Sequence, residues 1–236
     1  MISVLLVTAC SRFDPYRSLT TEEVSELLVR VKAQKSRTTD STDCQALSAA
    51  DINDIIARVA ETPLEQVTKR EIALFETDYG CMVFAFYPDS AYKHVQAFKR
   101  LVKTGFYDCT QFHRVMKGFV IQGGDILTRD GESDNDGTGS PGYTLPAEFN
   151  RIAHDKGVLS MARGQQPDTA GSQFFICLSR EGTKNLDGKY TVFGRIIGGF
   201  DVMDKIAAVK TVPNRYGEPS VPVEPITLLK AYWLDR

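Results

Sequence analysis

The stretch FHRVMKGFVIQGGD, residues 112–125, decides how this chain is expected to fold. Its pattern indicates a strand, a tight turn and a second strand. Arg114 and Gln122 stand among several apolar side chains, so we expect the hairpin to present one cation and one amide on an apolar surface. Such a surface suits the binding of an apolar segment of polypeptide.

A second block, SMARGQQPDTAGSQFF at residues 160–175, adds polar and aromatic side chains of the same kind. After the first hundred or so residues the chain alternates between short strand-like runs and turns rich in glycine and asparagine. Many short strands at such spacing, with few helices, indicate a closed barrel or a sandwich. Strands are expected at residues 111–115, 119–123, 158–161, 173–178, 191–196 and 226–232.

The N-terminal part of the chain, residues 11–70, is expected to be helical. Apolar residues recur at the spacing of an amphipathic helix in residues 20–34, and a second helix opens at Ser48 or Asp51. No chemical motif occurs in this part. About sixty residues bury too little apolar surface for a strong core of their own. We therefore expect this extension to pack weakly or to lean on the rest of the chain.

The composition is that of an ordinary soluble globular protein. The 236 residues are 42% apolar and 25% charged, and the net charge of -2 gives no general attraction to nucleic acid, so no nucleic-acid partner is predicted. The five cysteines form no C-x-x-C pair and the three histidines do not cluster with them, so no metal site and no cofactor are predicted. Cys81, Cys109 and Cys177 lie in apolar sequence, where a buried free thiol is the simpler state, but the sequence leaves disulfide pairing open.

The first ten residues, MISVLLVTAC, end in a pattern similar to the lipobox of bacterial lipoproteins. In a lipobox, small residues precede a cysteine that is lipidated after cleavage, which here is Cys10. The run is too short to span a bilayer, and no Lys or Arg precedes it as in a usual secretory signal. Two interpretations follow. Residues 1–10 are a lipoprotein signal of a periplasmic protein anchored to the outer membrane through Cys10, or they are a buried strand of a cytoplasmic protein.

Three segments carry a resemblance to a known family. Residues 112–125, residues 160–176 and LDGKYTVFGRIIGGFDVMDKI at 186–206 resemble the cyclophilin family of peptidyl-prolyl cis-trans isomerases, closer to its bacterial members. The similarity extends in the same order over about residues 72–235.

The resemblance implies a mainly β fold, a closed eight-stranded antiparallel β-barrel capped by two α-helices, preceded by the helical N-terminal extension. The capping helices correspond to residues 91–103 and 200–209. The chain then divides into a signal-like segment at 1–10, the extension at 11–70 and a cyclophilin-like domain at 71–236. A monomer is expected.

The chemistry of such a protein can be stated from physical principles. Rotation about an X-Pro bond meets a barrier of about 20 kcal/mol because the planar amide is stabilised by resonance, and no covalent bond has to break. A catalyst therefore needs an apolar socket for the ring and a hydrogen-bond donor that favours the twisted amide, whose nitrogen lone pair has become an acceptor. A fixed guanidinium, which is always charged, can serve as this donor.

By position, Arg114 matches the family's catalytic arginine, and Gln122 matches the glutamine that helps to hold it and the substrate. Four residues match the proline pocket: Phe119, Val120, Phe175 and Leu186. Three more match groups that contact the extended substrate: Ala162, Arg163 and Gln173. The rim of the neighbouring pocket, which accepts residues preceding the proline, corresponds to Gly137 and Thr138.

Some positions depart from the eukaryotic type of the family. Asn185 stands where that type has a pocket tryptophan, and the only tryptophan of this chain is Trp233, so tight binding of cyclosporin is not expected. Tyr190 replaces a histidine, as in bacterial members, and keeps a polar tip over the ring. Val120 replaces a methionine with a stiffer wall. His113 is expected to point away from Arg114 as a hydrogen-bonded structural residue.

Two functional hypotheses remain. The first is an active isomerase that assists the folding of proline-containing polypeptides. The second is a module that binds proline-containing segments without useful catalysis and uses the helical extension as a scaffold. The presence of Arg114, Gln122 and Phe119 favours the isomerase.

Overall fold

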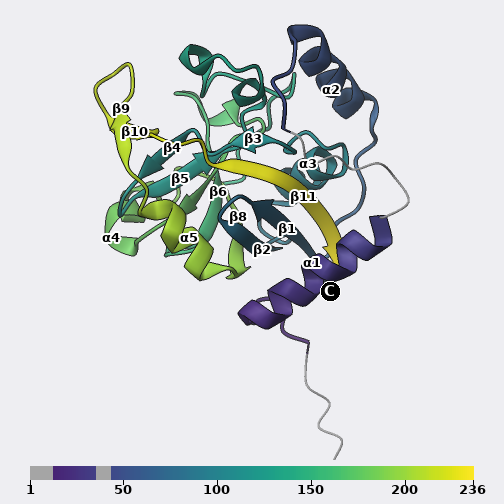
Figure 1. Cartoon of the computed structure of the whole chain (residues 1–236). Helices are drawn as coiled ribbons and strands as arrows, with labels where there is room; N and C mark the ends of the chain where they lie inside the picture. The colour runs from purple at the N-terminus through teal and green to yellow at the C-terminus, as the bar shows by residue number, and fades with distance from the viewer. Residues whose placement is uncertain (1–12, 36–43) are drawn as a thin grey trace, which may run out of the picture.

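A computed structural model describes residues 13–35 and 44–236 of the chain. One curved antiparallel sheet forms the body of the molecule, and helices lie on both of its faces (Figure 1). The helices of these ranges are α1 (Thr21–Lys35), α2 (Ala49–Glu61), α3 (Tyr92–Lys103), α4 (Arg180–Thr183) and α5 (Phe200–Ala207). None of them is both long enough and apolar enough to cross a membrane.

The sheet has nine strands in the order β3-β11-β1-β2-β8-β6-β7-β5-β4, and β9 and β10 form a separate hairpin. The first five in chain order are β1 (Glu71–Thr77), β2 (Gly80–Phe86), β3 (Thr110–Gln111), β4 (Arg114–Met116) and β5 (Val120–Gly123). The others are β6 (Val158–Met161), β7 (Phe174–Cys177), β8 (Val192–Gly198), β9 (Thr211–Pro213), β10 (Pro219–Pro222) and β11 (Thr227–Asp235).

The prediction of a closed eight-stranded barrel is confirmed only in part. The fold is mainly β and antiparallel, but the sheet has nine strands and is open, with β3 and β4 at its two ends. These two strands are consecutive in the chain, so the sheet curls until its ends approach each other. In the part of the chain that the structure describes, no ladder joins β3 to β4, and Gln111 of β3 forms an isolated bridge with Asp125, just after β5.

The single strand expected at residues 111–115 is therefore wrong. After β3 the backbone N–H of Phe112 donates to the carbonyl of Ile226, which continues the pairing with the β11 side. The chain then turns across, and Arg114 begins pairing with Gln122 of β5. One apolar run thus supplies strands to both ends of the sheet.

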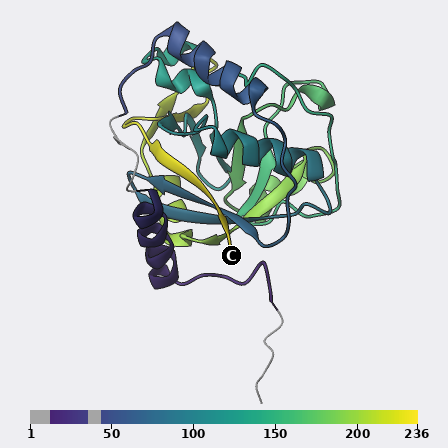
Figure 2. The ribbon, with the colours of Figure 1, turned by 90° about the vertical axis from the view of Figure 1, so that its right-hand side faces the viewer.

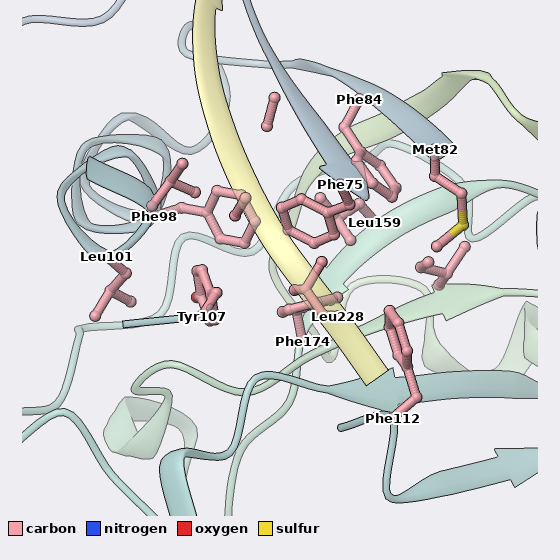
Figure 3. Close-up of a cluster of buried hydrophobic side chains, with 14 of the residues drawn as sticks. Phe75, Met82, Phe84, Phe98, Leu101, Tyr107, Phe112, Leu159, Phe174 and Leu228 are labelled. Carbon is pink, nitrogen blue, oxygen red and sulfur yellow. The ribbon is translucent and has the colours of Figure 1, made fainter. Parts of the chain in front are cut away.

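The main core fills the inside of the curled sheet. Aromatic rings from strands and from α3 meet there, as in the contact of Phe98 with Phe174 at 5.7 Å between ring centroids (Figure 3). Phe75 stacks on Phe98 at 5.9 Å and Tyr107 packs edge-on against Phe174. The amphipathic helices α3 and α5 both bury apolar faces in this core, as expected for the two capping helices.

Helix α1 lies on the outer face of the sheet. Thr20 and Glu23 form a reciprocal capping box at its start, which satisfies two backbone donors. Val24 and Val31 then pack with Leu74 and other outward-facing residues of β1, β2, β8 and β11. The extension therefore leans on the sheet, as its small size predicts.

Helix α2 lies at the other end of the molecule from α1 (Figures 1 and 2). Ser48 caps its N-terminus, and its apolar face, which includes Val59, joins the main core. The segment before it is tied to the domain by a disulfide between Cys44 and Cys109. Cys109 is therefore not the free thiol that its apolar surroundings suggest. The predicted lipidation site, Cys10, lies outside the described residues.

Candidate active site

Strand register brings the sequence-predicted residues into one row across the outer face of the sheet. Arg114 of β4 is paired with Gln122 of β5, and Gln122 is paired with Phe175 of β7. Because alternate residues of a strand face opposite sides, their neighbours Val115, Ile121 and Phe174 point into the core instead. Alternate residues of these strands therefore belong to the site and to the core.

An apolar cavity of about 350 Å³ lies beside this row. Phe119 and Val120 come from the end of the β4–β5 hairpin, while Leu186 and Tyr190 come from the segment between β7 and β8. Its full lining is Arg114, Phe119, Val120, Gln122, Ala162, Arg163, Phe175, Leu186 and Tyr190. The structure therefore gathers all the residues assigned to the proline pocket around one cavity.

A chain of hydrogen bonds connects Arg114 to the rim of a neighbouring cavity. The Nη1 of Arg114 donates to Oε1 of Gln122 at 3.3 Å, and Nε2 of Gln122 donates to Oε1 of Gln173 at 3.1 Å. Gln173 in turn donates to the carbonyls of Gly137 and Gly139. The two glutamines thereby hold the guanidinium and the rim in a fixed relation.

The rim loop is held by the buried carboxylate of Asp125. It accepts backbone N–H groups of Gly137 and Gly139 on Oδ2 and of Leu127 on Oδ1. A side chain at position 139 would collide with this carboxylate, because an added Cβ would lie 1.8 Å from Oδ1. Glycine is needed there for the close approach of backbone and carboxylate.

The neighbouring cavity has a volume of about 400 Å³. Gly137 and Thr138 line it on the loop side, and Ala162, Arg163 and Gln173 line it on the sheet side. The rim assignments from the sequence thus fall together in space. Helix α2 and the residues just before it support this loop: Leu47, which precedes α2, donates its backbone N–H to the carbonyl of Arg129, and Ile56 of α2 approaches Gly142.

The sequence did not reveal the charged residue that contacts Arg114. The carboxylate of Glu218, which directly precedes β10, accepts from Nε of Arg114 at 2.7 Å and from Nη2 at 3.0 Å. A further cavity of about 510 Å³ lies between this hairpin, Arg114 and residues 133–137. Glu218 is 104 residues from Arg114, and no local pattern connects them.

Behind the apolar cavity, His154 supports Phe175. The two rings stack at 6.0 Å, and the imidazole contacts Asp187 on one nitrogen and Ser160 on the other. Burial lowers the pKa of His154, while Asp187 acts in the opposite direction. Arg180 holds the pKa of Asp187 well below its usual range. Asp187 is therefore an anion. Because it directly follows Leu186, its contacts with His154 and Arg180 hold this wall of the apolar cavity in place.

The polar edge of the apolar cavity is formed by Tyr190 and Arg163. Tyr190 packs edge-on against Phe175, and the guanidinium of Arg163 lies 4.6 Å from the centre of the Tyr190 ring. Arg163 also donates to the carbonyl of Lys189. Trp233 does not take part, because it stacks on Phe86 and donates to Glu71.

His113 differs from its expected role. Within the described ranges neither of its ring nitrogens has a hydrogen-bond partner, and the residue lines the same cavity as Arg114 and Glu218. Burial lowers its pKa. The prediction of a hydrogen-bonded structural histidine on the opposite face is therefore wrong, because His113 precedes β4, which begins at Arg114, so the alternation of a strand does not extend to it.

Cys81 and Cys177 are free thiols, as the sequence predicts. Burial raises the pKa of Cys177 to about 12 and of Cys81 to about 11, so both are protonated near neutral pH. Among the described residues, no group of three or more His, Cys, Asp or Glu side chains is placed to hold a metal ion.

Residues 72–232 match the family model described as cyclophilin type peptidyl-prolyl cis-trans isomerase/CLD. The chain belongs to the cyclophilin family. The matched region contains every residue of the cavity and its rim. It begins at the second residue of β1 and leaves both helices of the extension outside.

Two curated relatives and one solved structure illustrate the similarity. A probable peptidyl-prolyl cis-trans isomerase of the bacterium Brucella abortus is 40% identical over 132 residues, which are 54% of this chain and 66% of the relative. One from Arabidopsis thaliana is 35% identical over 163 residues, covering 69% of this chain and 70% of the relative. A crystal structure of a Cryptosporidium parvum cyclophilin in the presence of the dipeptide Ala-Pro has a TM-score of 0.61 and 29% identity, and the match covers 70% of this chain and 99% of that chain.

Proposed function

We propose that this cyclophilin is a peptidyl-prolyl cis-trans isomerase that accelerates rotation about X-Pro bonds and so assists the folding of proline-containing polypeptides. The observation that carries the proposal is the position of Arg114, whose guanidinium is fixed at the wall of an apolar cavity. Membership of the family and the names of the relatives support the same activity.

Arg114 is the group that lowers the barrier. When the prolyl amide twists, its nitrogen becomes an acceptor, and the guanidinium can donate to it without any proton transfer. A hydrogen bond that exists only in the twisted state raises the rate, whereas equal binding of both states does not. Gln122 holds the guanidinium on the side of the cavity.

The substrate is an extended segment with its proline ring in the apolar cavity. Phe119, Val120, Phe175 and Leu186 enclose the ring, and Tyr190 keeps a polar edge above it. The segment runs along Ala162 and Arg163, with Gln173 as a further contact. Residues preceding the proline lie in the neighbouring cavity at Gly137 and Thr138.

A direct assay separates this function from simple binding. NMR exchange spectroscopy on a short Ala-Pro peptide measures the cis-trans exchange rate with and without the protein. An isomerase at substoichiometric concentration increases the exchange rate severalfold or more. A protein that broadens the peptide signals through binding but leaves the exchange rate unchanged is a proline-binding module, and that result would refute the proposal.

We also propose that the protein works outside the cytoplasm, anchored to a membrane through a lipidated Cys10. The Cys44–Cys109 disulfide supports an oxidising compartment, where disulfides persist. The lipobox-like ending at Cys10 supports the anchor. Mass spectrometry of the protein from its native cells should show diacylglycerol on Cys10 as the first residue, and an intact Met1 would contradict it.

A further inference from the structure

We propose that Glu218 is a positioning residue for catalysis: it orients the guanidinium of Arg114 so that one edge stays directed at the bound prolyl amide. This inference rests on the proposed isomerase function and adds a residue to its machinery. Glu218 lies on the β9–β10 hairpin, which is placed beside β4 at the edge of the sheet (Figure 1).

The contact between the two side chains is bidentate. Oε1 of Glu218 lies 2.7 Å from Nε of Arg114, and Oε2 lies 3.0 Å from Nη2. Two parallel charge-assisted hydrogen bonds fix the plane of a guanidinium as well as its position. The side chains are 27% and 31% exposed, so the pair is largely shielded from solvent. The hydrogen bonds from Arg114 lower the pKa of Glu218, which is therefore an anion near neutral pH.

Glu218 leaves one edge of the Arg114 guanidinium unoccupied, and this edge is the one available to the substrate. Nη1 of Arg114 donates to Gln122, which lines the apolar cavity. Nη1 carries two hydrogens, so one remains for an acceptor in the cavity. Glu218 on one side and Gln122 on the other thus restrict rotation of a side chain that otherwise has several rotatable bonds.

The hairpin holds Glu218 in place. Its backbone N–H donates to Oδ1 of Asn214, and its carbonyl accepts the backbone N–H of Asn214, which closes the turn. Gly217 within this turn has a φ of 81°. Arg215 donates to the carbonyl of Asp134 and ties the hairpin to the loop on the far side of the cavity. The carboxylate is therefore presented by a braced turn.

A carboxylate beside a catalytic cation could have the opposite effect and mask it. The geometry favours positioning, because Glu218 occupies Nε and Nη2 and leaves Nη1 toward the cavity. Loss of orientation weakens a hydrogen bond made in the twisted state, so it should lower kcat more than it changes KM. Loss of a mask would raise kcat instead.

The test measures kcat and KM for an Ala-Pro peptide by NMR exchange with the wild-type protein and with E218A, E218Q and E224A. Glu224 lies just beyond β10 and is exposed, so E224A is the matched control next to the same hairpin. We expect E218A to lower kcat about tenfold with KM within about twofold. E218Q keeps one acceptor and should fall between E218A and the wild type, whereas E224A should equal the wild type. Circular dichroism confirms that each variant is folded.

The same measurement in an R114A background shows whether Glu218 acts through Arg114. We expect E218A to have no further effect on kcat there. The inference is refuted if E218A has unchanged or higher kcat in the wild-type background, or the same tenfold loss in both backgrounds. If the wild-type protein itself does not accelerate exchange, the proposed function fails; if it is active and sensitive to R114A but not to E218A, only the role of Glu218 fails.

Discussion

The outer face of the sheet carries two apolar regions, and only one of them is covered. Over β1, β2 and β8, helix α1 packs Val24 and Val31 with Leu74 and its neighbours. Over β5 and β7, Val120 and Phe175 border an open cavity beside a fixed arginine. The chain thus fills one apolar region with its own helix, and we propose that the other is left for a ligand. The covered region should serve stability, and the open region should serve binding and catalysis.

Next to the open region, the rim loop is supported by α2, and the segment before α2 is tied to the domain by a disulfide. Replacing both Cys44 and Cys109 by serine removes a link between positions 65 residues apart. Loss of this constraint on the unfolded chain should lower the free energy of unfolding by about 4 kcal/mol, measured by urea denaturation. KM for an Ala-Pro peptide should rise, because α2 braces the loop of Gly137. C81S is the control, and an equal loss in both variants would argue against a stabilising link.

The covered region can be broken at Leu74. This side chain is fully buried beneath α1. Leu74→Ala should lower the free energy of unfolding by about 3 kcal/mol, because it leaves a cavity between strand and helix. The folded fraction should keep the wild-type kcat and KM in the exchange assay. A large change in KM would show that the two regions are coupled.

The open region can be broken at Leu186. This side chain forms a wall of the apolar cavity and still touches solvent. Leu186→Ala should cost about 2 kcal/mol of stability, less than the change at Leu74, because one side of Leu186 already lacks packing. Leu186→Ala should lower kcat/KM more than Leu74→Ala does, by about tenfold in the exchange assay. An unchanged kcat/KM would show that Leu186 is not part of the proline pocket.

The smallest effect concerns pH. Burial lowers the pKa of His154, which stacks behind Phe175 in the open region. The unfolded chain therefore binds a proton more readily than the folded protein, and stability should fall as the pH drops below about 6.5. His113 adds in the same direction. The midpoint of thermal unfolding at pH 7.5 and pH 5.5 should differ less in H154Q than in the wild type, and an equal drop would rule out this role of His154.

Short-range sequence patterns predicted the elements whose structure depends mainly on neighbouring residues. Alternation and turn signals predicted the hairpin that pairs Arg114 with Gln122, and helical periodicity predicted α1 and α2. Resemblance to the family added Phe175 and Leu186, whose apolar character alone would assign them to the core. These residues do line one cavity.

Contacts between distant segments could not be predicted in this way. Nothing near Glu218 in the sequence indicates a partner 104 residues away, and nothing in the cysteine spacing distinguishes Cys44 and Cys109 from the other cysteines. The open sheet has the same origin, since the failure of β3 and β4 to form a ladder depends on how the whole sheet curls. Long-range geometry decides all three features.

The catalytic role of Arg114 is tested most directly by Arg114→Ala in the NMR exchange assay on an Ala-Pro peptide. Arg151 is exposed and lines none of the three cavities described above, so R151A is the matched control. We expect R114A to lower kcat by about a hundredfold or more while the Kd for the peptide changes little, because the donor acts in the twisted state. R151A should match the wild type. A kcat for R114A within twofold of the wild-type value, in a folded protein, would contradict the role assigned to this arginine.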